Sequence, residues 1–176
     1  MVCDQVMVDL ETLGVRDGAA ILKIALIAFS LDPADPSMVE HELPIGLDSE
    51  HFGEIDGKTV GWWMGQSKEA IQDSFFDPSR VSLQEALKSF HDFIDCWASP
   101  LKGFWSKGPT FDELLLRSAW ERCGMEGDFP VPYWTSRCVR TAEAMLKQPI
   151  AFEGAKHTAI ADARHQVKIV RAAFAQ

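Results

Sequence analysis

Val6-Met7-Val8-Asp9-Leu10, followed directly by Glu11, predicts a short buried strand with two acids at its end. Asp9 and Glu11 are two residues apart, so both side chains leave the same face of the strand, whereas Leu10 points into the core. Two carboxylates on one face repel each other unless a positive charge lies between them. A divalent cation with oxygen ligands is the expected partner. A strand end with two solvated acids is the alternative interpretation of this stretch alone.

The pattern that follows predicts an α/β fold. Further strands are expected over 21–29, 39–45 and 101–106. Helices are expected over 59–74, 82–97, from Thr110 onward, 140–147 and 158–174. Thr110 and Glu113 fit the capping-box pattern of a helix start. Strands first, then helices alternating with one or two further strands, indicate a mixed central sheet flanked by helices. We expect one domain spanning residues 1–176.

Composition limits the function classes. Hydrophobic residues make up 47% of the 176 residues and charged residues 24%, which is typical of a globular protein. The longest apolar run, 19–29, is interrupted by Lys23 and is too short to cross a bilayer, so no membrane partner is expected. The four cysteines form no Cys-x-x-Cys pair, which favours reduced thiols and a cytoplasmic location over structural zinc.

The net charge of −9 constrains any interaction with nucleic acid. Proteins that grip long duplexes without sequence preference usually have a basic surface, since neutralisation of phosphates dominates that affinity. Two bound divalent cations would cancel part of the acidity. The remainder indicates a pocket for a strand end or a short oligonucleotide and argues against an extended groove.

Two later motifs add candidate site residues. Asp112 follows the Gly108-Pro109 turn at the start of a predicted helix, and His157 stands five residues before Asp162 at the start of the last one. Taken separately, each has an ordinary explanation, because acids favour the first turn of a helix and surface histidines are common. Taken with Asp9 and Glu11, they supply four carboxylates and one imidazole for metal-dependent cleavage of phosphodiester bonds.

In order and spacing these residues resemble the DEDD superfamily of 3′–5′ exonucleases, which has a ribonuclease-H-like fold. The pattern His-x-Ala-x-x-Asp, met by His157, Ala159 and Asp162, marks the DEDDh branch. Further stretches are similar to the phage exonuclease A family and its bacterial exoribonuclease relatives, namely 8–14, 62–66, 105–112 and 137–141. Within the last of these, Cys138 stands where those relatives more often have an acid.

The resemblance implies a two-metal mechanism with Mg²⁺ or Mn²⁺. Asp9 would bridge two ions, Glu11 and Asp162 would hold the one that carries the attacking water, and Asp112 would help to hold the second. His157 would take the proton from that water. The expected products are nucleoside 5′-monophosphates released from the 3′ end of RNA or single-stranded DNA.

Three residues are candidates for binding the substrate end: Trp63, Gln66 and Lys107. Trp62 or Trp63 could stack on the terminal base, although at least one of this pair is expected in the core. Gln66 could hydrogen-bond the base or sugar, and Lys107 could contact a phosphate or remain a solvated loop charge. Relatives of this kind often pair, so a homodimer is a further expectation.

Two other functions compete with this interpretation. The first is an oligoribonuclease-like enzyme that acts on very short oligonucleotides, which the acidic charge favours. The second is a nucleic-acid-binding module that kept the fold and lost turnover. The presence of all four acids together with His157 argues against the second function.

Overall fold

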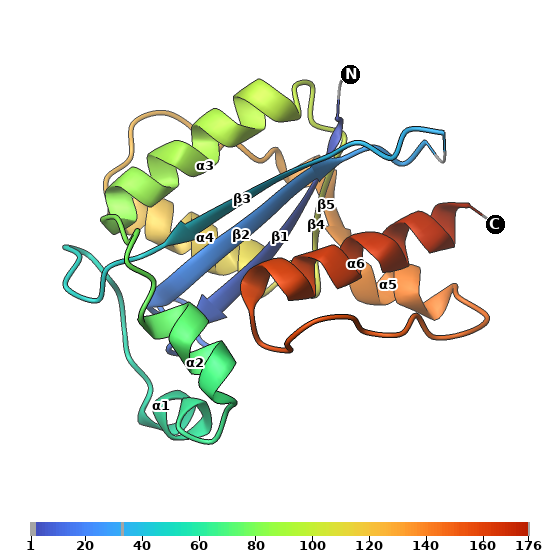
Figure 1. The fold of residues 1–176 in the computed structure, drawn as a ribbon. Helices are drawn as coiled ribbons and strands as arrows, with labels where there is room; N and C mark the ends of the chain where they lie inside the picture. The colour runs from blue at the N-terminus through green and yellow to red at the C-terminus, as the bar shows by residue number, and fades with distance from the viewer. Residues whose placement is uncertain (1–2, 33, 176) are drawn as a thin grey trace.

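A five-stranded sheet forms the centre of the molecule in the computed structural model, which describes residues 3–32 and 34–175 (Figure 1). The strands lie in the order β3-β2-β1-β4-β5. Their bounds are Gln5–Thr12 for β1, Ile21–Phe29 for β2, Met38–Pro44 for β3, Gly103–Ser106 for β4 and Ser136–Cys138 for β5. The predicted range 1–176 therefore includes residues 1, 2, 33 and 176, which lie outside the described part of the chain.

The sheet is mixed, as predicted. β1 pairs antiparallel with β2 and β2 with β3, whereas β4 runs parallel to both β1 and β5. The first three strands agree closely with the predicted ranges. The three-residue strand β5 was not predicted individually, because a segment this short has too few residues to display an alternating pattern.

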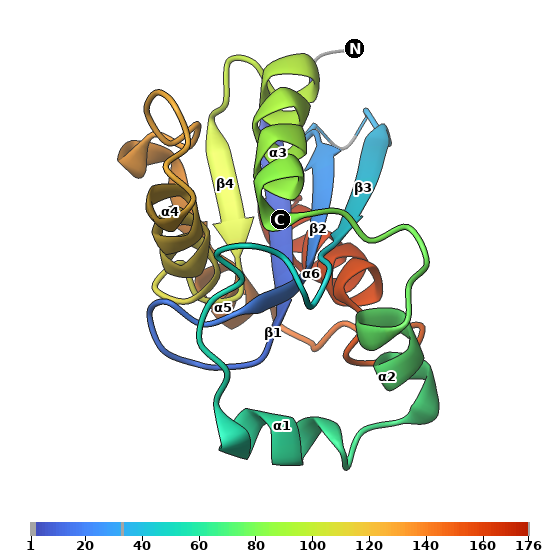
Figure 2. The ribbon, with the colours of Figure 1, turned by 90° about the vertical axis from the view of Figure 1, so that its left-hand side faces the viewer.

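Helices cover both faces of the sheet (Figures 1 and 2). Helices α3 (Leu83–Trp97) and α4 (Asp112–Arg122) lie on one face, and α5 (Val139–Ala144) and α6 (Ala159–Phe174) lie on the other. The start of α3 is fixed by a capping box, in which Ser82 and Glu85 each accept a backbone hydrogen bond from the other residue. No helix among the described residues combines the length and apolar character needed to span a membrane.

The single helix predicted over 59–74 is wrong. The structure has two short helices there, α1 (Gly57–Trp63) and α2 (Lys68–Phe75), which project beyond one end of the sheet (Figure 2). The cause is local, because the Ser67 side chain accepts a hydrogen bond from the backbone N–H of Ala70 and so starts a new helix. We call α1 and α2, with the turn between them, the helical arm.

The capping box predicted at Thr110 is also wrong. Helix α4 begins at Asp112, and the preceding Phe111 makes no side-chain capping bond. Glu113 is unavailable as a capping partner, because its carboxylate accepts hydrogen bonds from Arg117 on the next turn and from the Ser136 hydroxyl on β5. A tertiary contact therefore overrides the local sequence pattern.

Candidate active site

The end of β1 brings two of the predicted acids to the last helix. Asp9 and Glu11 project from β1, and Asp162 comes from the first turn of α6. One carboxylate oxygen from each of the three lies within 4.8 Å of the others. Glu11 is buried, and Asp9 and Asp162 are partly buried, so the three charges meet where little water can separate them.

Asp112 faces the same space from the other side. It is the first residue of α4 and is buried. We call this space the acidic hollow; it has a volume of about 230 Å³ and is lined by Asp9, Leu10, Glu11, Lys107, Phe111, Asp112, Arg140, His157, Asp162 and Gln166. All four predicted acids and the predicted histidine therefore border one space, although their roles remain predictions.

The crowding of these acids raises their pKa values. The pKa of Asp9 lies well above its ordinary value because of burial and the charges of Asp112, Glu11 and Asp162. Burial is also the main cause that raises the pKa of Glu11 to about 8 and that of Asp112 to about 7. Without a counter-charge, the group thus holds protons near neutral pH. A divalent cation would supply that counter-charge, and oxygen ligands of this kind suit Mg²⁺ or Mn²⁺.

Gln166 supports the acidic hollow and was missed by the sequence analysis. Its Nε2 donates a hydrogen bond of 2.6 Å to Oδ1 of Asp9. This bond opposes the rise in the pKa of Asp9, since it favours the charged form. A signal was available, because Gln166 follows Asp162 by four residues and so lies on the same face of α6.

His157 lies at the rim of the acidic hollow in an unusual backbone conformation. Its φ is +61°, and its backbone N–H donates a hydrogen bond of 2.8 Å to Oδ2 of Asp162. Its imidazole contacts Trp62 of α1 edge to face, with ring centroids 5.0 Å apart. The histidine is thus fixed between the last helix and the helical arm, with its ring next to the acids.

Beside the acids lies a second space with aromatic walls. It has a volume of about 450 Å³, and its lining consists of Leu10, Glu11, Thr12, Val15, Asp56, Lys58, Thr59, Trp62 and Trp63. We call it the aromatic hollow. It shares Leu10 and Glu11 with the acidic hollow. A ligand reaching from one space to the other would therefore pass directly over Glu11.

The two tryptophans at this position differ in exposure, which agrees with the expectation that at least one of them is in the core. Trp63 is 2% exposed and its indole N–H donates to the backbone oxygen of Thr12 at 2.9 Å, whereas Trp62 is 45% exposed. Trp63 therefore belongs to the core as well as to the wall of the aromatic hollow. Trp62 is the more accessible surface for stacking, although Trp63 was the residue predicted for it.

The other two predicted substrate contacts lie at different places. The Gln66 side chain donates to the backbone oxygen of Trp62, and Gln66 lines neither of the two hollows. Lys107 does line the acidic hollow, where its Nζ lies 3.5 Å from a carboxylate oxygen of Glu143.

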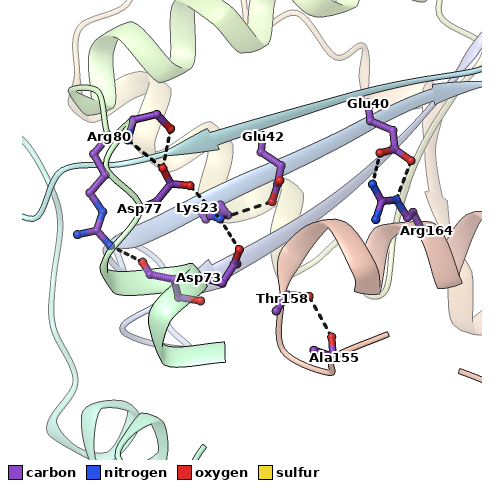
Figure 3. A network of polar contacts seen from close by, with 11 residues as sticks. Lys23, Glu40, Glu42, Asp73, Asp77, Arg80, Ala155, Thr158 and Arg164 are labelled. Atoms are coloured by element: carbon purple, nitrogen blue, oxygen red, sulfur yellow. Dashed lines mark hydrogen bonds and ion pairs between the residues drawn. The ribbon is translucent and has the colours of Figure 1, made fainter. Parts of the chain in front are cut away.

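A buried lysine fastens the helical arm to the sheet next to the acids (Figure 3). Lys23 lies on β2 directly opposite Glu11 and is 1% exposed. Its Nζ contacts the carboxylates of Asp73, Asp77 and Glu42 at 2.9, 3.5 and 3.5 Å. The positive charge of Lys23 opposes the rise in the pKa of Glu11. The same lysine thus supports both the arm and the acidic hollow.

Comparison with known proteins relates this arrangement to nucleases. Residues 4–174 match the family described as "3′-5′ exoribonuclease Rv2179c-like domain". The chain is also 30% identical over 167 residues to the exodeoxyribonuclease of Enterobacteria phage T4, a match that covers 80% of this chain and 71% of the phage protein.

Two solved structures share the fold. The nuclease domain of 3′hExo, a DEDDh family member bound to rAMP, has a TM-score of 0.56 at 9% identity, covering 95% of this chain and 89% of that one. Cell-death related nuclease 4 (CRN-4) has a TM-score of 0.58 at 12% identity, covering 97% and 63%. These likenesses confirm the predicted ribonuclease-H-like mixed sheet.

Proposed function

Because this chain belongs to the 3′–5′ exoribonuclease Rv2179c-like family and is a DEDDh-type 3′–5′ exonuclease, we propose that it hydrolyses the terminal phosphodiester bond of RNA or single-stranded DNA with two divalent cations. The product is a nucleoside 5′-monophosphate. The observation that carries this proposal is the meeting of Asp9, Glu11 and Asp162 within 4.8 Å, with Asp112 lining the same hollow.

The donor set fits Mg²⁺ or Mn²⁺. Glu11 and Asp162 would hold one ion, Asp112 the other, and Asp9 both. Raised pKa values of Asp9, Glu11 and Asp112 support this assignment, since they reflect a repulsion that bound cations would relieve. When bound, such ions stabilise negative charge on the attacking and departing oxygens of the phosphodiester.

The residues of the chain orient the acids and move the proton. Gln166 holds the Asp9 carboxylate through the bond to Oδ1, and the backbone of His157 holds that of Asp162. The His157 imidazole takes a proton from the attacking water. As the resulting hydroxide adds to phosphorus, the bond to the 3′-oxygen of the penultimate nucleotide breaks, and that oxygen takes a proton from solvent and leaves as the 3′-hydroxyl of the shortened strand.

The aromatic hollow receives the terminal nucleoside. Its position next to Glu11 would place a base beside Trp62 and the shared Leu10 when the phosphate lies over the acids. Stacking on an aromatic side chain contributes about 1–3 kcal/mol per base and accepts any base. Trp63 would complete the wall of the hollow. Gln66 would contact the base or sugar only after its hydrogen bond to the Trp62 backbone oxygen breaks. Lys107 would contact a phosphate after its ion pair with Glu143 breaks.

A second candidate function is an oligoribonuclease-like activity on very short oligonucleotides. The net charge of −9 favours it, because few phosphates could be neutralised far from the acidic hollow. Substrates of two to five nucleotides would then be cleaved faster than longer ones. A non-catalytic binding module is disfavoured, since the hollow contains the complete set of acids.

We also propose a cytoplasmic location, a single domain over the whole chain and a homodimer. The location is supported by four free cysteines, and the single domain by apolar cores on the two faces of one sheet. The homodimer rests on the family resemblance.

The test is a time course with matched 5′-labelled RNA and DNA oligonucleotides in Mg²⁺, in Mn²⁺ and in EDTA. We expect a ladder that shortens from the 3′ end in either metal and no cleavage in EDTA. The faster ladder identifies the preferred sugar. Cleavage inside the strand, or equal cleavage in EDTA, would contradict the proposal.

A further inference from the structure

Arg140 lines the acidic hollow on the side away from the aromatic hollow. It lies in the first turn of α5, directly after β5, and does not border the aromatic hollow. The strand order places β2, to which the helical arm is fastened, on one side of β1, and β4 and β5 on the other. Figures 1 and 2 show α2 and α5 on opposite sides of β1.

The loop before Asp112 leaves room for the Arg140 guanidinium. A Cβ placed on Gly108 would lie 2.7 Å from Nη1 of Arg140, which is closer than real Cβ contacts allow. Gly108 also has a φ of +141°, which L-residues rarely adopt. The glycine between Lys107 and Pro109 thus leaves open the space that the end of the Arg140 side chain occupies at the edge of the hollow.

The guanidinium of Arg140 keeps its donors available. Arg117 and Arg164 form ion pairs with Glu113 and Glu40. The Arg140 side chain, in contrast, forms no hydrogen bond or ion pair within residues 3–32 and 34–175. Arg140 is exposed. The lysine in the same lining, Lys107, is already engaged with Glu143.

We propose that Arg140 binds the phosphate on the 5′ side of the scissile one, in the strand that departs after cleavage. This inference rests on the proposed function, in which the terminal nucleoside occupies the aromatic hollow. The strand then has to leave across the opposite side of the acids, where Arg140 lies. A planar guanidinium with free donors fits two phosphate oxygens at once, which a lysine ammonium does not. It also supplies positive charge in a chain whose net charge is −9.

The experiment compares oligonucleotides that differ at one linkage. One has an ordinary phosphate next to the scissile linkage, and the other has an uncharged methylphosphonate there. We expect the methylphosphonate to lower kcat/KM of the wild type by about 10- to 100-fold, the range of a charge-assisted contact. Arg140→Gln should lower kcat/KM on the ordinary substrate by a similar factor and should no longer distinguish the two oligonucleotides. Arg140→Lys should recover part of the distinction.

The control is Arg137→Gln, which changes an exposed arginine outside the hollow and should keep the wild-type sensitivity to the methylphosphonate. On thymidine 5′-monophosphate p-nitrophenyl ester, which lacks the second phosphate, Arg140→Gln should lose much less activity than it loses on the ordinary oligonucleotide. The inference is overturned if Arg140→Gln remains sensitive to the methylphosphonate, or if it loses as much activity on the small ester. Failure of the proposed function would look different, since the wild type itself would not release the 3′-terminal nucleotide.

Discussion

At the scale of single residues, the acidic hollow depends on groups that repel one another until cations are present. Asp9 is hydrogen-bonded by Gln166, and Asp162 by the backbone of His157, yet the pKa of each is still raised. Burial is the first cause in both cases. The side chains are therefore held in place at a cost in stability, which is the usual compromise at a functional site.

His157 should affect turnover more than metal affinity. Its side chain contacts Trp62, while its backbone, which any residue provides, orients Asp162. His157→Gln should therefore lower kcat by about 10²- to 10⁴-fold, the range for a lost general base, and leave Mg²⁺ affinity measured by calorimetry nearly unchanged. Unaltered turnover at neutral pH would remove the imidazole from the mechanism. Replacement of the exposed His51, which lines neither hollow, is the matched control.

Glu11 should make the metal-free protein less stable as the pH rises. Burial raises the pKa of Glu11 from its ordinary 4.5 to about 8 in the folded state. Because this pKa is raised on folding, the contribution of Glu11 to the free energy of unfolding is complete below pH 4.5 and is lost as the pH rises to about 8. In EDTA, the difference in Tm between the wild type and Glu11→Gln should therefore shift against the wild type as the pH is raised from 5 to 8. A difference that stays constant over this range would contradict the raised pKa.

Arg140 and Lys23 mark the limit of prediction at this scale. The order of the acids and the His157 spacing could be found in the sequence because each lies in a short motif. Arg140 and Lys23 belong to segments that come close to the acids only after folding. Arg140 lies in the stretch 137–141 that is similar to the exonuclease family, but that likeness gave it no role, and only the structure places Arg140 and Lys23 beside the acids.

At the scale of elements, the helical arm is the part whose position the site most requires. Trp63 fastens α1 to the end of β1, and Lys23 fastens α2 to β2. Trp62, next to Trp63 on α1, contacts the His157 ring edge to face. Helix α1 therefore forms one wall of the aromatic hollow, with Thr59, Trp62 and Trp63 in its lining.

Lys23→Met should loosen the arm. The change leaves the carboxylates of Asp73, Asp77 and Glu42 without their shared cation and should lower the free energy of unfolding by about 1–3 kcal/mol. KM for oligonucleotides should rise because Trp62 is no longer held in place. Chemical denaturation and steady-state kinetics measure the two effects.

Arg164→Met is the control for Lys23→Met, because the Arg164–Glu40 pair is more exposed and should contribute less than about 1 kcal/mol (Figure 3). Equal losses of stability in the two variants, with KM unchanged in both, would show that Lys23 does not position the arm.

Helix boundaries were the least predictable feature of the elements. Long amphipathic segments such as α3 and α6 could be predicted, because each presents one apolar face along its length. The break before Ser67 depends on one side-chain hydrogen bond, and the engagement of Glu113 depends on the three that it accepts from Arg117 and Ser136. Helical periodicity contains no information about such bonds.

At the scale of the whole molecule, the acidic charge should limit contacts with distant phosphates. A protein with a net charge of −9 that holds one strand end neutralises few phosphates. In a plot of log(1/KM) against the logarithm of the salt concentration, each contacted phosphate should contribute about −0.7 to the slope. We expect the slope to correspond to no more than about two contacted phosphates. Kinetics on 5-, 10- and 30-nucleotide strands at several salt concentrations measure this slope. A steeper slope for the longest strand would indicate an extended basic track.

The topology explains why acids so far apart in the chain meet. The central position of β1, between β2 and β4, brings the starts of α4 and α6 to its end. Asp9, Asp112 and Asp162 therefore border one hollow although the chain separates them widely. The predicted mixed sheet made this meeting plausible, and the family resemblance specified the residues.

We propose that these acids carry out hydrolysis at the 3′ end. The most direct measurement is the rate at which Asp9→Asn releases nucleoside 5′-monophosphate at saturating Mg²⁺, beside Asp95→Asn, an acid-to-amide change at an exposed position on α3. We predict that Asp9→Asn lowers this rate on the order of 100-fold or more and that Asp95→Asn keeps the wild-type rate. The Tm of Asp9→Asn in EDTA should be at least as high as that of the wild type. A folded Asp9→Asn protein as active as Asp95→Asn would contradict the account.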